Sequence, residues 1–292
     1  MKTATAAFVV LEAIWFGVVM SRWAGCGLRS NQMKIDRIGF VGTGAITEAM
    51  VRGLLTEPAY ASEIHVSPRS AHIAATLADE FAAVRIAKDN QDVVERSDMV
   101  FLAIRPQVAE EVVRALSFRD GQMIVSLVAA TERQALSEWI AADVHLVQAI
   151  PLPFVAGRQG VTAIYPPDTA VAALFDALGT AVQCQSRKGY DLLAAASAMM
   201  STYFGIMEQV AVWLERNGLE KAKGQAYIAP LFASLAQKAN SPGNEPFSAL
   251  SREFATKGGL NEQVFSDFEM KGGLAALTAA LDGVLARIEG KN

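Results

Sequence analysis

The sequence predicts an α/β fold in which a doubly wound sheet is followed by an all-α part. Two observations predict it. From Lys34 to Cys184, short apolar runs alternate with amphipathic helical segments, which is typical of parallel strands joined by helices. From Lys188 onward, the pattern is helical almost throughout. We predict three segments: residues 1–32, a leader or mistranslated extension outside the fold; 33–186, the doubly wound domain; and 187–292, an all-helical domain.

The composition fits a folded protein of about two domains and excludes several kinds of partner. The chain has 292 residues, of which 52% are hydrophobic and 19% charged, so it can bury a core. Its formal net charge of -4 gives no support to a nucleic-acid or anionic-membrane surface. Cys26 and Cys184 match no metal or redox spacing, so we expect no metal site and a reducing cytoplasm.

The first 32 residues carry an apolar run behind Lys2 that superficially resembles a signal peptide. Glu12 interrupts the run, which at roughly 17 residues is short for a membrane-spanning helix. Met33 is followed at once by "KIDRIGFVGTG", which reads as the start of a domain. We therefore expect an inessential extension, and a signal or membrane anchor is the alternative.

The first apolar strand, "RIGFVG", runs into a glycine turn and then into the helical segment "AITEAMVRGLL". Strand, glycine turn and helix form the Rossmann-type dinucleotide-binding arrangement, although Thr47 replaces the third glycine of that motif. Gly42 allows the tight turn, and Gly44 lets the backbone approach a pyrophosphate at the helix N-terminus. A plain tight turn is the alternative. The predicted contacts are Gly42, Thr43, Gly44, Ala45 and Ile46.

The end of the second strand, "EIHVS", predicts which dinucleotide binds. An NAD-selective site carries an acidic residue there, and this chain has none. It has Ser67, Arg69 and Ser70 instead, and a guanidinium with two hydroxyls suits the 2′-phosphate of NADP. We therefore predict NADP(H), with NAD(H) less favoured. The alternative is that Arg69 merely opens the next helix in solvent.

Three more strands, "DMVFLAIRPQ", "QMIVSLVAA" and "HLVQAIPLP", alternate with helices. Ligands bind at the carboxyl ends of parallel strands, where small side chains leave room for a flat ring. The candidates at those ends are Ala103, Ile104, Arg105, Pro106, Gln107, Ala129, Ala130 and Pro151.

The remaining chain predicts one more strand, a helix and a short strand over residues 160–184, and then helices. The segment "DLLAAASAMMSTYFGIMEQVAVWLERNG" reads as a single long helix ended by Asn217 and Gly218. It is too apolar all round to face solvent, and Ala194 to Ala198 would allow close helix approach. We therefore expect it to be buried between subunits of a homodimer or higher homo-oligomer.

Together, "IGFVGTGAITEAMVRGLL", "SPRS", Asn90, "VFLAIRPQ" and "VSLVAA" resemble the pyrroline-5-carboxylate reductase family in order and spacing, from about Ile35 to Ile288. The resemblance implies an NAD(P)-binding Rossmann domain with a helical dimerisation domain. It also implies reduction of the C=N bond of a cyclic imino acid, the last step of proline synthesis. It further implies that Asn90 lies against the adenosine, and that Ala103, Arg105 and Pro106 lie near the nicotinamide, with Arg105 replacing a typical lysine.

The segments on the substrate side depart from the family pattern at three places. Leu152 in "IPLPF" replaces an amide. "SAMMSTY", residues 197–203, lacks two glycines and a proline of the family, so we expect the helix to start earlier and run straighter. "TKGGLN", residues 256–261, keeps the glycine pair but replaces the threonine donor with Asn261.

The chemistry that the resemblance implies is hydride transfer to a C=N bond, which needs a hydrogen-bonded or protonated nitrogen. Gly258 and Gly259 break a helical stretch and could offer N–H groups to a substrate carboxylate. Lys257 could add a positive charge there or simply be solvated. We predict Asn261 as the catalytic residue, because its amide can donate or accept a hydrogen bond.

We therefore predict a cytoplasmic NADPH-dependent oxidoreductase that reduces a cyclic imine or imino acid. One alternative is a catalytically silent NADP-binding protein. Another is a hydroxyacid-type dehydrogenase, which would need a lysine such as Lys188. Tyr203 is a possible proton donor or a packing aromatic, and none of the three histidines is expected near the reacting ring.

Overall fold

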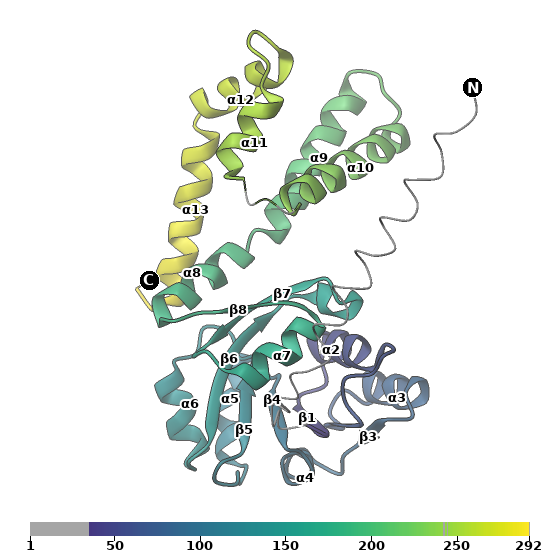
Figure 1. The fold of residues 1–292 in the computed structure, drawn as a ribbon, viewed down its shortest axis with the longest axis vertical. Coiled ribbons are helices and arrows are strands. Elements are labelled where there is room, and N and C mark those ends of the chain that lie inside the picture. Colours follow the sequence, from purple (N-terminus) through teal and green to yellow (C-terminus); the bar gives the residue numbers. More distant parts are fainter. Residues whose placement is uncertain (1–34, 242, 244, 292) are drawn as a thin grey trace, which may run out of the picture. The chain divides into compact units, whose positions relative to one another are not determined.

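The structure is a computed structural model that describes residues 35–241, 243 and 245–291, so the predicted extension 1–32 lies outside the described residues. The eight strands of the described residues form one sheet with the order β3-β2-β1-β4-β5-β6-β7-β8 (Figure 1). The strands are β1 (Arg37–Val41), β2 (Glu63–Val66), β3 (Val84–Ile86), β4 (Met99–Leu102), β5 (Met123–Ser126), β6 (His145–Pro151), β7 (Gly160–Tyr165) and β8 (Gly179–Gln183). The helices among and after them are α2 (Ala45–Leu55), α3 (Ala71–Glu80), α4 (Asn90–Arg96), α5 (Pro106–Arg114), α6 (Arg133–Ile140), the 3-10 helix η1 (Pro153–Gly157), α7 (Thr169–Ala177), α8 (Arg187–Ser197), α9 (Met200–Arg216), α10 (Lys221–Ala239), α11 (Phe247–Phe254), α12 (Leu260–Met270) and α13 (Gly273–Ile288).

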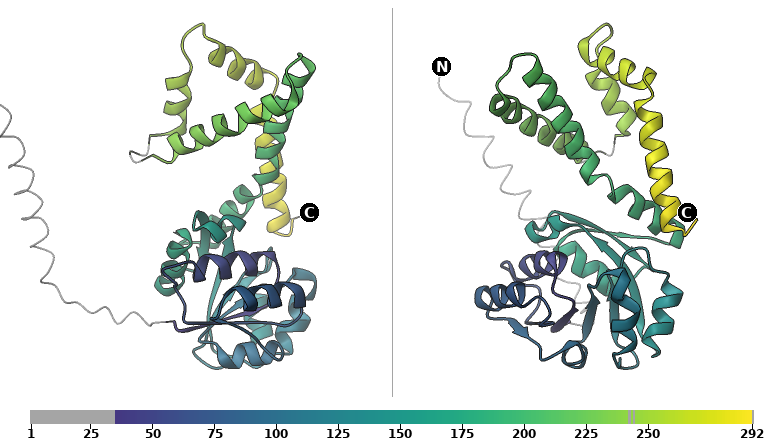
Figure 2. Two further views of the ribbon diagram at one scale, coloured as in Figure 1. Left: turned by 90° about the vertical axis from the view of Figure 1, so that its right-hand side faces the viewer. Right: turned by 180° about the vertical axis from the view of Figure 1, so that it is seen from behind.

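The first six strands confirm the predicted doubly wound sheet. β1 lies between β2 and β4, and all pairings from β3 to β6 are parallel. Helices α2 and α3 lie on one face of the sheet and α5 and α6 on the other (Figures 1 and 2). Because the strands run the same way, the segments that follow β1, β4, β5 and β6 emerge at one edge.

The seventh strand, whose direction the sequence did not predict, pairs antiparallel with β6. The connection between them is only the short helix η1, and a parallel crossover would need a dozen or more residues. β8 then pairs parallel with β7 after the crossover through α7. The sheet is therefore mixed, and β7 and β8 are added to it on the side of β6.

The core of the sheet is built from strands that are buried on both faces. Every residue of β4 is buried, and four of the five residues of β1 are buried. Phe40 of β1 stacks on Phe101 of β4 with ring centroids 4.9 Å apart, and Phe175 of α7 meets Phe101 edge-on. Such offset and edge-on contacts add to the burial of apolar area that fixes the strand order.

The buried His65 of β2 predicts a dependence of stability on pH. Burial lowers the pKa of His65. The carboxylate of Glu63, which lies 3.5 Å from Nε2, raises the pKa, but by less than burial lowers it. The unfolded chain therefore takes up a proton more readily, so the free energy of unfolding should fall as pH drops below about 6.5. Urea unfolding at about pH 7.5 and about pH 5.5 should show a smaller fall in His65→Leu than in the natural chain. Equal falls in both would contradict this role of His65.

The prediction of one straight helix over "DLLAAASAMMSTYFGIMEQVAVWLERNG" is wrong. The chain breaks between α8 and α9, where the N–H groups of Ala198 and Met199 donate to carbonyls three residues back. The Ser197 hydroxyl also donates to Ala194 O at 2.7 Å. A serine that bonds back to its own helix and a tight 3-10 turn both bend a helix without any glycine or proline.

The last helical run is divided at Gly272. Gly272 adopts a φ of +82°, a left-handed conformation that favours glycine, so α12 ends and α13 begins there. α12 packs on α13, and α13 packs on α8. α8 in turn packs on β7.

The helices from α9 onward leave much of their apolar surface exposed within one chain. The structure describes no buried residue in α11, α12 or α13, and Ala211 is the one buried residue of α9. Trp213 of α9 is 58% exposed and Met270 of α12 is 76% exposed. A single chain therefore does not supply the burial that the apolar composition of these helices predicts.

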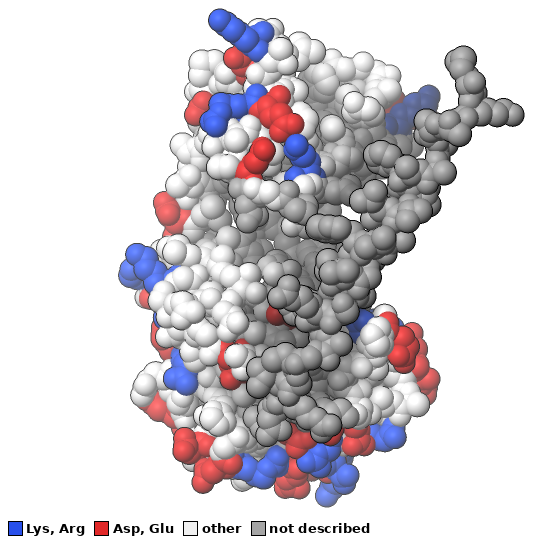
Figure 3. Space-filling model, in the orientation of Figure 1, with Lys and Arg blue, Asp and Glu red and all other residues white. Residues whose placement is uncertain are grey.

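Within the described residues, no helix combines the length and the apolar character that a membrane crossing needs. On the face seen in Figure 3, basic and acidic side chains are interspersed over the sheet-bearing part, so this face carries no field of a single sign.

Candidate functional site

The glycine turn after β1 has the geometry that the sequence predicts. Gly42 adopts a φ of +103°, and a Cβ atom placed there would lie 2.3 Å from the carbonyl oxygen of Ala103. Only glycine fits such a position, because the backbone is left-handed and the neighbouring backbone is already in contact. The turn after β1 thus lies directly against the residues that follow β4, including Ile104.

Helix α2 begins immediately after this turn. Gly44 is its N-cap residue, and a Cβ atom at Gly44 would meet nothing within 4 Å. The side chain of Thr47 donates to Gly42 O at 2.6 Å, so the residue in the third glycine position holds the turn in place. Open space over a helix N-terminus with free N–H groups is what a pyrophosphate requires, and Ala45 and Ile46 lie in that first turn.

Ser67 directly follows β2, at the strand end that the sequence predicts, and its side chain faces the glycine turn. It is fully buried, its hydroxyl accepts from Gly42 N–H at 3.0 Å, and its carbonyl accepts from the Thr43 hydroxyl at 2.6 Å. Ser67 therefore shapes the glycine turn. Arg69 is exposed and makes no ion pair within the described residues, and Ser70 is the N-cap of α3, so these two remain the candidates for the phosphate.

The other predicted cofactor residues lie where their strands end. Asn90 is half-buried at the first position of α4, whose N-cap Asp89 accepts from Asp92 N–H. Arg105 is the exposed N-cap of α5, and Pro106 is its first residue. Ala129 is exposed after β5, on the segment that neighbours the one after β4. These segments lie at the same sheet edge as Gly42.

The glycine pair Gly258 and Gly259 confirms the predicted helix break, because Gly258 has a φ of +75° between α11 and α12. The N–H groups of both glycines already have acceptors. The Gly258 N–H donates to the Glu262 carboxylate at 2.6 Å, and the Gly259 N–H donates to Thr256 O at 2.7 Å. The side chain of Glu262 thus occupies the anion position that the sequence assigned to a substrate carboxylate.

The two other residues predicted in this loop, Lys257 and Asn261, are exposed. The Asn261 amide nitrogen donates to Phe254 O at 3.0 Å, so it links the start of α12 to the end of α11. Lys257 makes no ion pair with any residue that the structure describes.

Within one chain, the loop of residues 256–261 and the glycine turn after β1 are not brought together. α12 lies at the end of the helical part that is remote from β1 (Figures 1 and 2). Its main contacts are with α13. A cleft with the glycine pair as one wall and Gly42 to Gly44 as the other is therefore not formed by a single chain.

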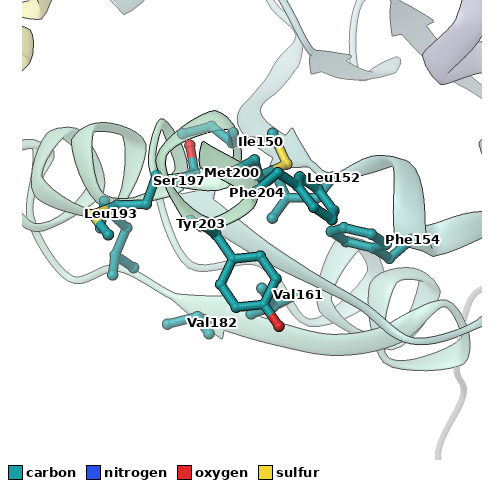
Figure 4. A pocket seen from close by; sticks show the side chains of 13 residues that line it. Ile150, Leu152, Phe154, Val161, Val182, Leu193, Ser197, Met200, Tyr203 and Phe204 are labelled. Atoms are coloured by element: carbon teal, nitrogen blue, oxygen red, sulfur yellow. The ribbon is translucent and has the colours of Figure 1, made fainter. Parts of the chain in front are cut away.

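A cavity of about 600 Å³ lies between the last strands of the sheet and the bend from α8 to α9. Its polar side chains are Ser197 and Tyr203, and no charged residue lines it (Figure 4). Its residues come from the segments on which the sequence departs from the family pattern and from the faces of β7 and β8. They are Ile150, Leu152, Phe154, Val161, Ala163, Val182, Leu193, Ala196, Ser197, Met199, Met200, Tyr203 and Phe204.

A partly buried arginine links α8 to the sheet near this cavity. Arg187 Nε donates to Asp191 Oδ1 at 2.7 Å, and Arg187 Nη1 donates to the side chain of Gln148 on β6 at 3.5 Å. Gln148 is itself fixed, because its amide nitrogen donates to Thr131 O at 2.9 Å. The first turn of α8 is thereby tied to the middle of β6.

The sequence interpretation missed two features of this site. The alternation in "GVTAIY" places Val161 and Ala163 on one face of β7, a period-2 signal that could have identified the wall of the cavity. Glu262 was also missed, although an acidic residue in the first turn of a helix after a glycine pair is a signal for an internal N-terminal anion.

Comparisons with known proteins agree with this geometry. A family model described as NADP oxidoreductase, coenzyme F420-dependent, matches residues 37–130. The pyrroline-5-carboxylate reductase of Vibrio alginolyticus is 24% identical over 267 residues, which cover 88% of this chain and 98% of that protein.

Two solved structures extend this similarity to the fold. The 1-pyrroline-5-carboxylate reductase of Streptococcus pyogenes matches with a TM-score of 0.73 and 24% identity, covering 87% of this chain and 98% of its own. The Plasmodium falciparum pyrroline carboxylate reductase, solved with NADP bound, matches with a TM-score of 0.72 and 13% identity, covering 88% and 98%. The resemblance predicted from the sequence is confirmed: over most of its length the chain is similar to proteins named pyrroline-5-carboxylate reductase, and it shares the fold of the solved ones.

Proposed function

We propose that this protein uses NADPH to reduce the C=N bond of a cyclic imine or imino acid, as its relatives named pyrroline-5-carboxylate reductase indicate. The observation that carries the proposal is the turn from Gly42 to Gly44, which combines a position that only glycine fits with open space over the N-terminus of α2. Binding of a pyrophosphate at such a helix start is the ordinary use of this arrangement.

The residues present fit NADPH. The first turn of α2 would hold the pyrophosphate, and Arg69 with Ser70 would hold the 2′-phosphate, because a free guanidinium matches the phosphate oxygens. Asn90 would lie along the adenosine. Ala103, Ile104, Arg105, Pro106 and Ala129 would line the nicotinamide side, since they follow β4 and β5 at the same edge.

When bound, NADPH supplies a hydride for the imine carbon, and the imine nitrogen must gain a proton as the C=N bond becomes a C–N bond. The chain's task is to hold the imine close to the nicotinamide and to supply a donor to that nitrogen. The candidates are Asn261, as the sequence predicts, and the Tyr203 hydroxyl; Asn261 can only hydrogen-bond to the nitrogen, so that the proton would come from solvent, whereas Tyr203 could give a proton itself. The latter has no hydrogen bond within the described residues.

We also infer that residues 187–292 form a dimerisation and substrate domain beside a cofactor domain of residues 33–186. Two observations support a homodimer: the exposed apolar surface of α9 to α13, and the distance of the loop at 256–261 from the glycine turn of its own chain. A second copy would cover the first and would supply the loop to the cleft. Sedimentation velocity of the full chain tests this, and a monomer at micromolar concentration would overturn it.

For Asn261→Ala we expect turnover to fall by about tenfold with little change in NADPH affinity, because one hydrogen bond near the reacting nitrogen is lost. Steady-state kinetics and NADPH titration by fluorescence measure the two quantities. Asn261→Asp keeps the size of the side chain but removes the amide donor, so it should be as slow as the alanine variant. An unchanged rate in Asn261→Ala would remove this residue from the mechanism.

NADPH oxidation by the full chain with a panel of cyclic imines, with and without a carboxylate, tests the proposed function. Oxidation that forms one amine per NADPH supports it. Tight NADPH binding without oxidation of any imine would favour a catalytically silent NADP-binding protein. The hydroxyacid-type alternative finds no support in the site, because Lys188 is exposed and does not line the cavity.

A further inference from the structure

We propose that the substrate is an uncharged cyclic imine with an apolar ring or substituent, which lies in the cavity between β6 to β8 and the bend from α8 to α9. The proposal rests on the proposed function and names the class of its substrate. It depends on the character of this cavity, its place at the sheet edge, and the hydrogen bonds inside the loop at 256–261.

The cavity is suited to an apolar group. Its volume of about 600 Å³ lies within the range of ligand sites, roughly 300–1,000 Å³. Leu152, Phe154 and Leu193 are among the side chains that surround it (Figure 4). The lining side chains offer a carboxylate no cation, so an uncharged apolar group is the better occupant.

The cavity also lies where a substrate must approach the cofactor. Ile150 and Leu152 belong to the carboxyl end of β6 and the residue just after it, and β6 runs parallel to β5, as β5 does to β4. The cavity therefore begins at the edge where the segments after β1 and β4 form the predicted cofactor site. Ile150 and Ala163 are paired across β6 and β7, so the wall continues over the sheet from this edge.

The cavity offers one hydroxyl that is free to act on a polar atom. The Ser197 hydroxyl donates to Ala194 O within α8. The Tyr203 hydroxyl has no hydrogen bond within the described residues, and Figure 4 shows its ring reaching from α9 towards Val161 and Val182. One donor in an apolar cavity suits a molecule with one nitrogen and no charged group.

The loop at 256–261 does not provide the carboxylate-binding group that the cavity lacks. Its glycine N–H groups already donate to Thr256 O and to the Glu262 carboxylate. These bonds are local, so they would persist if the loop met a second copy of the chain. The carboxylate of Glu262 also stands at the start of α12, where it would repel a second carboxylate. Lys257 is the one cation of residues 256–262 and Glu262 the one anion, so their formal charges balance.

The test measures kcat/KM of the full chain with NADPH for 2-phenyl-1-pyrroline, 1-pyrroline and 1-pyrroline-5-carboxylate. We expect the phenyl compound to exceed the carboxylate by about tenfold or more, since the apolar lining can contact the phenyl ring and offers a carboxylate no cation. A higher value for the carboxylate would overturn the inference and leave the proposed function standing. Absence of NADPH oxidation with all three would overturn the proposed function and this inference with it.

A matched pair of variants tests the cavity itself. Leu193→Asp introduces a charge at a side chain that is 38% exposed, so the chain should still fold. It should lower kcat/KM for 2-phenyl-1-pyrroline by about tenfold without changing NADPH affinity, whereas Leu193→Met should retain the rate. Equal rates in the two variants would overturn the assignment. Dissociation of a dimer by Leu193→Asp would also overturn it, because the occupant would then be a second copy of the chain.

Discussion

Gly44→Ala should bind NADPH about 10- to 100-fold more weakly than the natural chain, because its methyl group would stand where the pyrophosphate approaches the N–H groups of α2. The substitution should leave the fold intact. A Cβ atom at Gly44 meets no atom within 4 Å, and the residue has no left-handed φ. NADPH titration and thermal unfolding without cofactor measure the two effects separately.

Two other glycines serve as controls for this prediction. Gly157→Ala adds the same methyl group where it also meets nothing within 4 Å, so both affinity and Tm should be unchanged. Gly42→Ala should lose stability as well as affinity, because its Cβ atom would lie 2.3 Å from Ala103 O at a φ of +103°. If Gly44→Ala bound NADPH normally, the site would not lie at the start of α2.

Arg69→Ala should weaken NADPH binding by about 10- to 100-fold and leave NADH binding nearly unchanged, because a charge-assisted contact to the 2′-phosphate is worth about 1.5–3 kcal/mol. Arg69 is exposed and makes no ion pair within the described residues, so its removal should not change Tm. Isothermal titration with each dinucleotide gives the ratio of the two affinities.

Arg114→Ala is the matched control, because Arg114 is an exposed arginine of α5 that pairs with Glu110 at 2.9 Å. It should change neither affinity by more than a small factor. An equal loss of NADPH and NADH in Arg69→Ala would show that the arginine does not distinguish the two cofactors. The difference in NADPH affinity between the natural chain and Arg69→Ala should shrink as the salt concentration rises, since screening weakens an exposed contact to a phosphate.

The first domain could be predicted from the sequence because its signals are local. An apolar run, a Gly42 that must be left-handed and a helix follow one another within one strand–turn–helix unit, and each strand end then falls at one edge of the sheet. The direction of β7 could not be predicted in this way. The direction of β7 depends on the length of the connection through η1, which is too short for a parallel crossover.

The substrate side could be predicted less well because its features depend on side chains that meet through the fold. The Gly258 break was visible in the sequence, but the carboxylate that takes its N–H group comes from Glu262, four residues onward. The bend at Ala198 follows from the bonding of Ser197 back into α8, which propensity does not reveal. The cavity wall combines Leu152, Val161 and Leu193 from three elements.

The central claim is that the chain transfers a hydride from NADPH to the carbon of a C=N bond. Incubation of the full chain with NADPH deuterated at the transferred position of C4, together with the cyclic imines above, tests it most directly. The account predicts one deuterium per molecule of amine, on the former imine carbon and in one stereochemical configuration, as shown by NMR and mass spectrometry. Oxidation of NADPH without deuterium in the amine, or no amine with any of the imines, would contradict it.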